Sequence, residues 1–152
     1  MPAPGRIEPD PPPSAPAALP NGTELGPAGE GGLGSLWLVN ESPQDALVKI
    51  VDAATPAWVR RIVYVQAGSQ AILWQIQPGT YLIRVGFGTD WDAARHRFRR
   101  GPSYAQLVTP LEFGEIELRT EIRYVRYKVP LAPALDARDG VMPLSERAFG
   151  AG

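Results

Sequence analysis

Short apolar runs recur between residues 35 and 131, and turn-forming residues separate them. Runs of about four to eight residues, bounded by Gly, Pro, Asn or Asp, are typical of β-strands in all-β proteins. Thr55-Pro56, Ala67-Gly68 and Pro78-Gly79 mark the clearest turns. The spacing predicts seven strands, at residues 35–40, 46–52, 58–66, 70–77, 80–88, 111–118 and 122–131.

The register of the apolar side chains predicts which face of each strand is buried. Successive side chains of a strand point to opposite faces, so every second residue shares an environment. In the strand at 80–88 this rule selects for the core Tyr81, Ile83, Val85 and Phe87. In the strand at 70–77 it selects Ile72, Trp74 and Ile76. Between 111 and 118 the apolar register changes across Gly114, which predicts a bulge.

Two stretches depart from this strand pattern. Residues 89–103 are polar and strongly charged, which predicts a long loop with one helical turn at 92–95. Residues 132–152 predict an irregular tail with a short turn of helix at 145–149. The chain is therefore expected to be all-β, an antiparallel β-sandwich of about seven strands and of immunoglobulin-like size over residues 35–131.

The first 34 residues differ from the rest in composition, because they contain 9 Pro and 7 Gly. Their few large apolar side chains do not offset the ordering entropy, which is about 1–2 kcal/mol per residue for the backbone alone. We expect residues 1–34 to be a disordered linker. It is either a solvated tail or, as we favour, a tether that holds the domain off a membrane or a neighbouring domain.

Charge and composition exclude several classes of function. The chain has 15 basic and 16 acidic residues, and it lacks the clustered basic excess of a nucleic-acid binder. Cysteine is absent, which excludes disulfides, thiolate catalysis and cysteine-ligated metals. The single histidine, His96, stands among arginines that disfavour an imidazolium, so a histidine-based triad is not expected. A zinc site is not expected either, because such sites normally use three or four ligands drawn from His, Cys and carboxylate, and the chain offers one His. No cofactor is predicted.

No apolar run approaches the roughly 18 residues of a membrane span, so direct membrane insertion is not expected. The first residues also lack the pattern of a signal peptide. An extracytoplasmic, membrane-tethered location is favoured over a cytoplasmic one.

The charged stretch at 89–103 holds the candidate interaction loop, formed by Asp90, Trp91, Asp92, Arg95, Arg97 and Arg99. Its two carboxylates are also the beginning of a calcium site, although the further oxygen ligands of such a site are missing nearby. A structural role is favoured, in which one aspartate caps a turn, the other pairs with an arginine, and the tryptophan is buried. The arginines then offer a local site for an anionic partner.

Two further hypotheses concern other residues. Glu115 and Glu117 are expected to share one face of a strand, and paired carboxylates are the groups that glycosidases use. A solvated sheet face produces the same alternation and is favoured. Exposed aromatic rings can stack on sugars, and the chain has four tryptophans: Trp37, Trp58, Trp74 and Trp91. The strand registers predict that most of them lie in the core or at its edge.

A family resemblance adds to this interpretation. Residues 63–85, VYVQAGSQAILWQIQPGTYLIRV, resemble a strand–turn–strand signature of bacterial prealbumin-like sandwiches, such as carboxypeptidase-regulatory-like and PEGA-type accessory domains. A longer pattern over residues 35–131, which includes the FGTDWD run at 87–92, is similar to a bacterial domain of uncharacterised function. That domain is usually found C-terminal to a membrane anchor, a zinc ribbon or helical repeats. The resemblance implies an accessory module and carries over no ligand-binding residue.

The sequence therefore predicts a non-catalytic structural or protein-interaction module of a bacterial, envelope-associated protein. Its expected partner is a protein rather than a glycan or a nucleic acid. A carbohydrate-binding β-sandwich remains the alternative.

Overall fold

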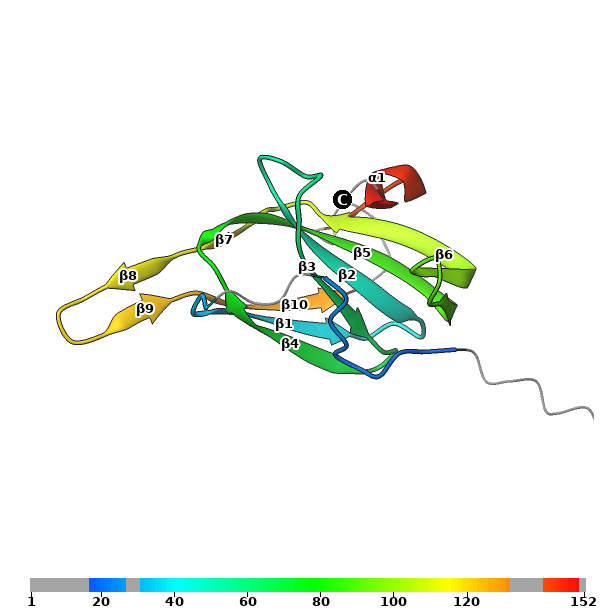
Figure 1. The fold of residues 1–152 in the computed structure, drawn as a ribbon, viewed down its shortest axis with the longest axis horizontal. Coiled ribbons are helices and arrows are strands. Elements are labelled where there is room, and N and C mark those ends of the chain that lie inside the picture. The colour runs from blue at the N-terminus through cyan, green and yellow to red at the C-terminus, as the bar shows by residue number, and fades with distance from the viewer. Residues whose placement is uncertain (1–16, 27–30, 132–140, 151–152) are drawn as a thin grey trace, which may run out of the picture.

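The computed structural model describes residues 17–26, 31–131 and 141–150. It confirms the predicted all-β architecture, because strands make up almost all of its regular structure (Figure 1). The strands are β1 Gly34–Asn40, β2 Asp45–Asp52, β3 Val59–Val65, β4 Gln70–Ile76, β5 Gly79–Asp92, β6 Arg97–Leu107, β7 Leu111–Phe113, β8 Glu115–Glu117, β9 Ile122–Tyr124, β10 Arg126–Leu131 and β11 Val141–Pro143. One short helix, α1 Glu146–Gly150, follows them.

Two sheets form the sandwich. The smaller sheet has the order β10-β1-β4, and the larger has the order β11-β6-β5-β2-β3, with β7 also paired to β5. The main core lies between them and includes Leu36 and Leu38 of β1, Val48 and Ile50 of β2, and Phe87 of β5, all at most 1% exposed. The predicted register of β5 is confirmed, since its four selected side chains are all buried.

The pairing of the first and last long strands differs from the antiparallel expectation. β1 pairs with β10 in parallel, from Ser35 opposite Arg126 to Asn40 opposite Leu131. The other ladders are antiparallel among the strands that the structure describes. The smaller sheet is therefore mixed, with β1 in its centre.

The predicted register of β4 is wrong. Ile72 and Trp74 are 44% and 60% exposed, whereas Ala71 and Leu73 face the core. Ile76 is buried as expected, because Gln75 adopts a left-handed conformation (φ 60°) that breaks the alternation just before it. Both faces of this strand are apolar in sequence, so periodicity alone does not determine which one is buried.

The predicted loop at residues 89–103 is also wrong. β5 continues to Asp92, β6 begins at Arg97, and only a four-residue turn, 93–96, joins them. The ladder runs from Asp92 opposite Arg97 to Arg84 opposite Gln106, with one irregularity between Phe87 and Thr89. The expected helical turn at 92–95 is thus the tip of a long hairpin.

Part of the predicted linker is folded against the larger sheet. Residues 17–26 run along β3, where Gly22 and Leu25 donate backbone hydrogen bonds to Tyr64 and Ile62, and Tyr64 donates one to Thr23. β3 is the edge of its sheet, and its backbone groups need partners there. The prediction of flexible coil is wrong for residues 17–26, and residues 1–16 lie outside the described part of the chain.

A second, smaller apolar cluster lies on the outer face of the larger sheet. It consists of buried Leu47, Tyr64, Trp91, Phe98 and Phe149. Leu19 and Leu25 of the N-terminal segment pack against it on one side, and α1 contributes Phe149 on the other. The turn of helix predicted at 145–149 is confirmed in α1, whereas β11 was not predicted. The intervening residues 132–140 are not described.

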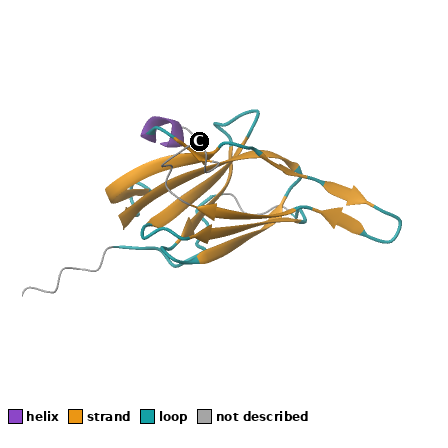
Figure 2. Cartoon of the chain, turned by 180° about the vertical axis from the view of Figure 1, so that it is seen from behind, coloured by secondary structure: helices purple, strands orange, loops and turns teal. Residues whose placement is uncertain are grey.

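The predicted bulge at Gly114 is a break between two strands. β7 before it pairs with β5, whereas β8 after it pairs with β9. The β8–β9 hairpin projects beyond both sheets as an arm, and this is visible from both sides of the molecule (Figures 1 and 2). We refer to residues 115–124 as the arm.

Candidate functional site

The candidate residues lie at the free end of the β5–β6 hairpin. Two of its non-glycine residues have left-handed backbone conformations, Asp90 with φ 62° and His96 with φ 53°. Asp and His are among the residues that tolerate this region best. The short turn between the strands brings all six predicted residues into one neighbourhood, but their side chains have different environments.

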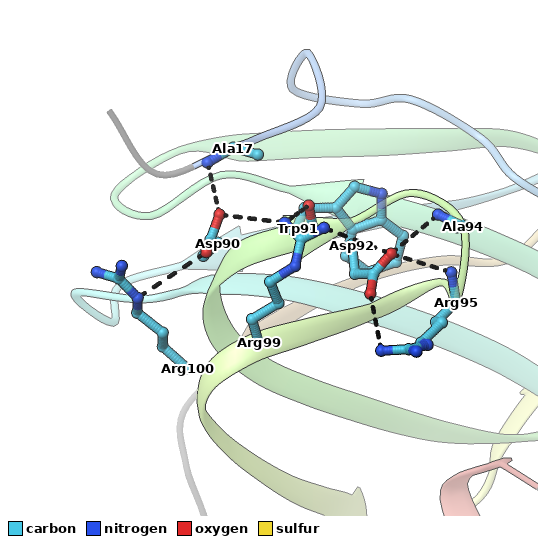
Figure 3. Close-up of polar contacts among 8 residues, drawn as sticks. All are labelled: Ala17, Asp90, Trp91, Asp92, Ala94, Arg95, Arg99 and Arg100. Atoms are coloured by element: carbon cyan, nitrogen blue, oxygen red, sulfur yellow. Dashed lines mark hydrogen bonds and ion pairs between the residues drawn. The ribbon is translucent and has the colours of Figure 1, made fainter. Parts of the chain in front are cut away.

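Asp92 holds the turn together (Figure 3). Its Oδ1 accepts hydrogen bonds from the backbone N–H groups of Ala94 and Arg95, at 3.1 and 3.2 Å. Its carboxylate also lies 3.8 Å from the guanidinium of Arg95 and 3.7 Å from that of Arg99. Burial acts to raise the pKa of Asp92, but these N–H groups and guanidinium groups outweigh it, so the pKa is lowered and the carboxylate stays charged.

Asp90 joins the hairpin to the N-terminal segment. Its Oδ1 accepts a hydrogen bond of 3.1 Å from the backbone N–H of Ala17. The backbone N–H of Trp91 donates a hydrogen bond of 2.7 Å to the backbone carbonyl of Ala17. The same carboxylate lies within 3.9 Å of Arg99 and Arg100 (Figure 3). This arrangement confirms the predicted pairing with arginine. The oxygens that a calcium ion would need are engaged by N–H and guanidinium groups.

Trp91 is buried, as predicted, and is 3% exposed. Its ring lies edge-on to Tyr64 and Phe98, at centroid distances of 5.4 and 5.2 Å, and stacks with the imidazole of His96 at 6.1 Å. Such aromatic pairs add about 0.5–1.5 kcal/mol each beyond the area they bury. Trp91 is therefore a support for the hairpin rather than an exposed contact residue.

A pocket of about 230 Å³ opens beside this support. Arg95, His96 and Arg97 from the hairpin line it, opposite Glu146 and Phe149 of α1. The side chains of Arg95 and Arg97 are 69% and 52% exposed. Arg99 does not line the pocket, because it faces the two aspartates. The structure thus divides the candidate residues into two groups. Asp90, Trp91, Asp92 and Arg99 support the hairpin, whereas Arg95 and Arg97 form an exposed basic rim at the pocket.

Sequence reasoning missed the residues that complete the pocket. Lys49 of β2 donates a hydrogen bond of 2.9 Å to the carbonyl oxygen of Phe149, and its ammonium lies 4.3 Å from the ring centroid of Phe149. Burial, and secondly the nearby charge of Arg84, lower the pKa of Lys49. The signal in the sequence was a single cation, Lys49, inside the otherwise apolar run at 46–51.

The C-terminal residues form one wall of the pocket. Phe149 packs against Tyr104 at a centroid distance of 4.9 Å, and Arg84 donates a hydrogen bond of 3.1 Å to the carbonyl of Ala148. Glu146 lies 3.8 Å from Arg97 and is the only acidic residue among the described residues that line the pocket. The other charged side chains in this described lining are the cations Lys49, Arg95 and Arg97.

The other candidate residues lie elsewhere. Glu115 and Glu117 share an exposed face of the arm and do not line the pocket. Trp37, Trp58 and Trp74 are 37%, 54% and 60% exposed. The prediction that most of the tryptophans lie in the core or at its edge is therefore wrong, and so is the burial expected of Trp74 in particular. Within the described residues, no group of three His, Asp or Glu side chains is placed to hold a metal ion, and no helix is long and apolar enough to cross a membrane.

Comparison with known proteins gives no family: no family model, curated protein or solved structure matches this chain. The resemblance to prealbumin-like accessory domains therefore stays a hypothesis.

Proposed function

We propose that this chain is a non-catalytic protein-interaction module that binds an acidic segment of a partner protein at the pocket between the β5–β6 hairpin and α1. The observation that supports this most strongly is the charge of the lining. Among the described residues, three cations line the pocket, Lys49, Arg95 and Arg97, together with one carboxylate, Glu146. Arg97 lies 3.8 Å from that carboxylate, and Arg95 lies 3.8 Å from Asp92 outside the lining. An acidic group entering the pocket meets an excess of cations.

The remaining lining defines what accompanies the acidic group. Trp91, Phe98, Tyr104 and Phe149 supply aromatic surface below the basic rim. A volume of about 230 Å³ is below the roughly 300–1,000 Å³ of pockets for drug-sized ligands. The pocket suits one apolar side chain, with carboxylates beside it at the rim. A short peptide with Leu or Phe among Asp and Glu has this chemistry.

A non-catalytic role agrees with how the acidic residues are used. Asp90 and Asp92 hold backbone N–H groups and arginines within the fold. The pair Glu115 and Glu117 lies on an exposed arm rather than in a cleft. A pair of carboxylates that hydrolyses glycosides needs a substrate between them.

The test uses labelled peptides that carry one Leu or Phe flanked by Asp and Glu, and counterparts in which Asn and Gln replace the acids. Fluorescence anisotropy should show binding of the acidic set only, and the affinity should fall with added salt. Arg97→Glu should weaken binding about tenfold. Arg123→Glu on the arm is the matched control, because Arg123 is also exposed and also lies beside one glutamate.

Equal binding of acidic and neutral peptides would contradict the proposal. So would an Arg97→Glu variant that binds as well as the control. A circular dichroism spectrum of each variant would show that the fold is retained.

A carbohydrate-binding role is the second candidate, and the exposure of Trp58 and Trp74 favours it. Sugars stack on open aromatic faces. However, cations already lie over one ring face of Trp37 and of Trp58, each 4.2 Å from the ring centroid. A glycan that quenches or shifts the tryptophan fluorescence of the parent protein but not that of Trp74→Ala would support this role. Addition of the acidic peptides should not change the contribution of Trp74 to the fluorescence.

A further inference from the structure

The outer face of the smaller sheet is apolar and basic. Trp37 of β1 lies between Ile72 of β4 and Lys128 of β10 in the strand register, and all three are exposed. Trp74 of β4 and Arg126 of β10 are exposed beside them. β1, β4 and β10 contain no acidic residue. We refer to Trp37, Ile72, Trp74, Arg126 and Lys128 as the basic face.

One side of the arm is apolar and acidic. Glu115 pairs with Tyr124 and Glu117 pairs with Ile122, and directly opposed residues share one side of a two-stranded sheet. Ile122 and Tyr124 are 49% and 40% exposed. We refer to these four residues as the acidic face.

The opposite side of the arm is different, because its charges pair with each other. It carries Ile116 and Leu118, together with Glu121 and Arg123, which form an ion pair of 3.2 Å. Of the two sides of this hairpin, only the acidic face has an excess of one charge, while the cation Arg119 lies in the turn between β8 and β9.

The basic and acidic faces form one continuous surface. β9 leads directly into β10, so Tyr124 and Arg126 stand two residues apart on the same side. Their side chains touch: the Arg126 guanidinium donates a hydrogen bond of 2.7 Å to the Tyr124 hydroxyl and lies 5.1 Å from its ring centroid. The surface therefore changes from basic on the three-stranded sheet to acidic on the arm, following the direction of β10 and β9.

We propose that two copies of this chain pack through this surface as a two-fold symmetric dimer, with the acidic face of each copy on the basic face of the other. In a two-fold symmetric interface, each contact between one patch of the first copy and another patch of the second copy occurs twice. A surface whose two halves are complementary can therefore pack against the same surface of a second copy. A two-fold axis near Tyr124 and Arg126 places each arm on the partner's three-stranded sheet. Apolar side chains then cover one another, and the glutamates meet cations.

The arm's position favours a second copy over the chain's own sheet as its partner. The arm points away from the body in line with β10 (Figures 1 and 2), so it does not lie on its own basic face. An isolated two-stranded hairpin is at best marginally stable in water. An exposed arm with four large apolar side chains gains stability when a partner covers one side of it.

The test is the oligomeric state of the full chain by sedimentation velocity across a concentration series. Ile122→Asp and Ile72→Asp should each weaken the dimer at least about a hundredfold, because each substitution occurs twice in the interface. Leu118→Asp is the matched control on the opposite side of the arm, and Trp58→Asp is the control for an exposed aromatic residue outside the basic face. Both controls should remain dimeric.

A charge exchange tests the same geometry without removing apolar contacts. Glu117→Lys and Lys128→Glu should each weaken the homodimer, since like charges then meet. Mixing the two variants should give a heterodimer at least about tenfold tighter than either homodimer, because opposite charges again meet at both contacts.

A parent chain that stays monomeric at all concentrations would overturn the proposal. Loss of the dimer in Leu118→Asp but not in Ile122→Asp would overturn it as well, and so would a mixture that forms no heterodimer. Binding of acidic peptides at the pocket is independent of these results, because Arg97 and Glu146 lie outside both faces.

Discussion

Replacing Gly88 with alanine should strongly destabilise the fold. Gly88 of β5 lies under the ring of Phe98, and a Cβ atom there would be 2.4 Å from the Cβ and 2.7 Å from the Cγ of Phe98. The ring has little room to move, because it packs against Trp91 at 5.2 Å and Tyr64 at 5.8 Å. The hairpin supports the pocket, so this change also tests how the site is held.

The magnitude follows from two effects. Overpacking a filled interior costs about 1–3 kcal/mol. Displacing Phe98 also weakens two aromatic contacts, worth about 0.5–1.5 kcal/mol each. We expect Gly88→Ala to lower the free energy of unfolding by about 2–4 kcal/mol, which is a large share of the typical stability of a small domain.

Urea unfolding followed by tryptophan fluorescence would measure this loss. Gly114→Ala is the matched control, because open space surrounds Gly114 in the link between β7 and β8, and its effect should stay within about 0.5 kcal/mol. In a Phe98→Gly background the Cβ and the ring atoms that would clash are all absent, so adding Gly88→Ala should then cost much less than it does in the parent. A Gly88→Ala protein as stable as the control would refute the predicted packing.

Three further predictions concern the segments around the larger sheet. Glu24→Gln should lower the free energy of unfolding by about 1–2 kcal/mol, because the Glu24 carboxylate lies 2.6 Å from the buried guanidinium of Arg61. An unchanged urea midpoint would show that residues 17–26 do not pack on β3. Burial and the hydrogen bond to Asp45 raise the pKa of Tyr64 above 10.0, so the unfolded chain loses this proton first as the pH rises. The free energy of unfolding should therefore fall above about pH 10 by about 1.4 kcal/mol per pH unit. Tyr64→Phe should make this fall with pH less steep, and an unaltered slope would contradict this assignment. Phe149→Ala should cost about 2 kcal/mol and release α1 from the sheet, which limited proteolysis would detect as faster cleavage near the C-terminus; equal cleavage rates would argue against docking.

The strands that could be predicted are those with one clearly apolar face. In β5, residues 81–87 have a large apolar side chain at every odd position and only one, Leu82, at an even position, so the sequence predicts the buried register directly. In β4 the sequence Ala-Ile-Leu-Trp is apolar on both faces, so the sequence does not favour either register. The choice depends on which side chains meet β1 and the core, and this is a tertiary effect.

Other features depend on contacts that leave no local pattern. β6 begins with Arg97, Arg99 and Arg100 and resembled a solvated loop, but two of these arginines face Asp90 across the hairpin. Residues 17–26 pair with β3 through backbone groups, which any sequence can supply. The pocket is assembled from β2, the hairpin and α1, so its lining became visible only once these distant segments were placed together.

The role of the pocket can be tested most directly by mapping peptide binding onto the chain. Two-dimensional ¹H–¹⁵N NMR spectra would be recorded while a Leu-containing acidic peptide is added to the full chain. The shifts should be largest at His96, Arg97, Glu146 and Phe149, which line the pocket, and in Arg97→Glu they should need about tenfold more peptide. Shifts confined to the arm or to the face around Trp74 would contradict the proposed site.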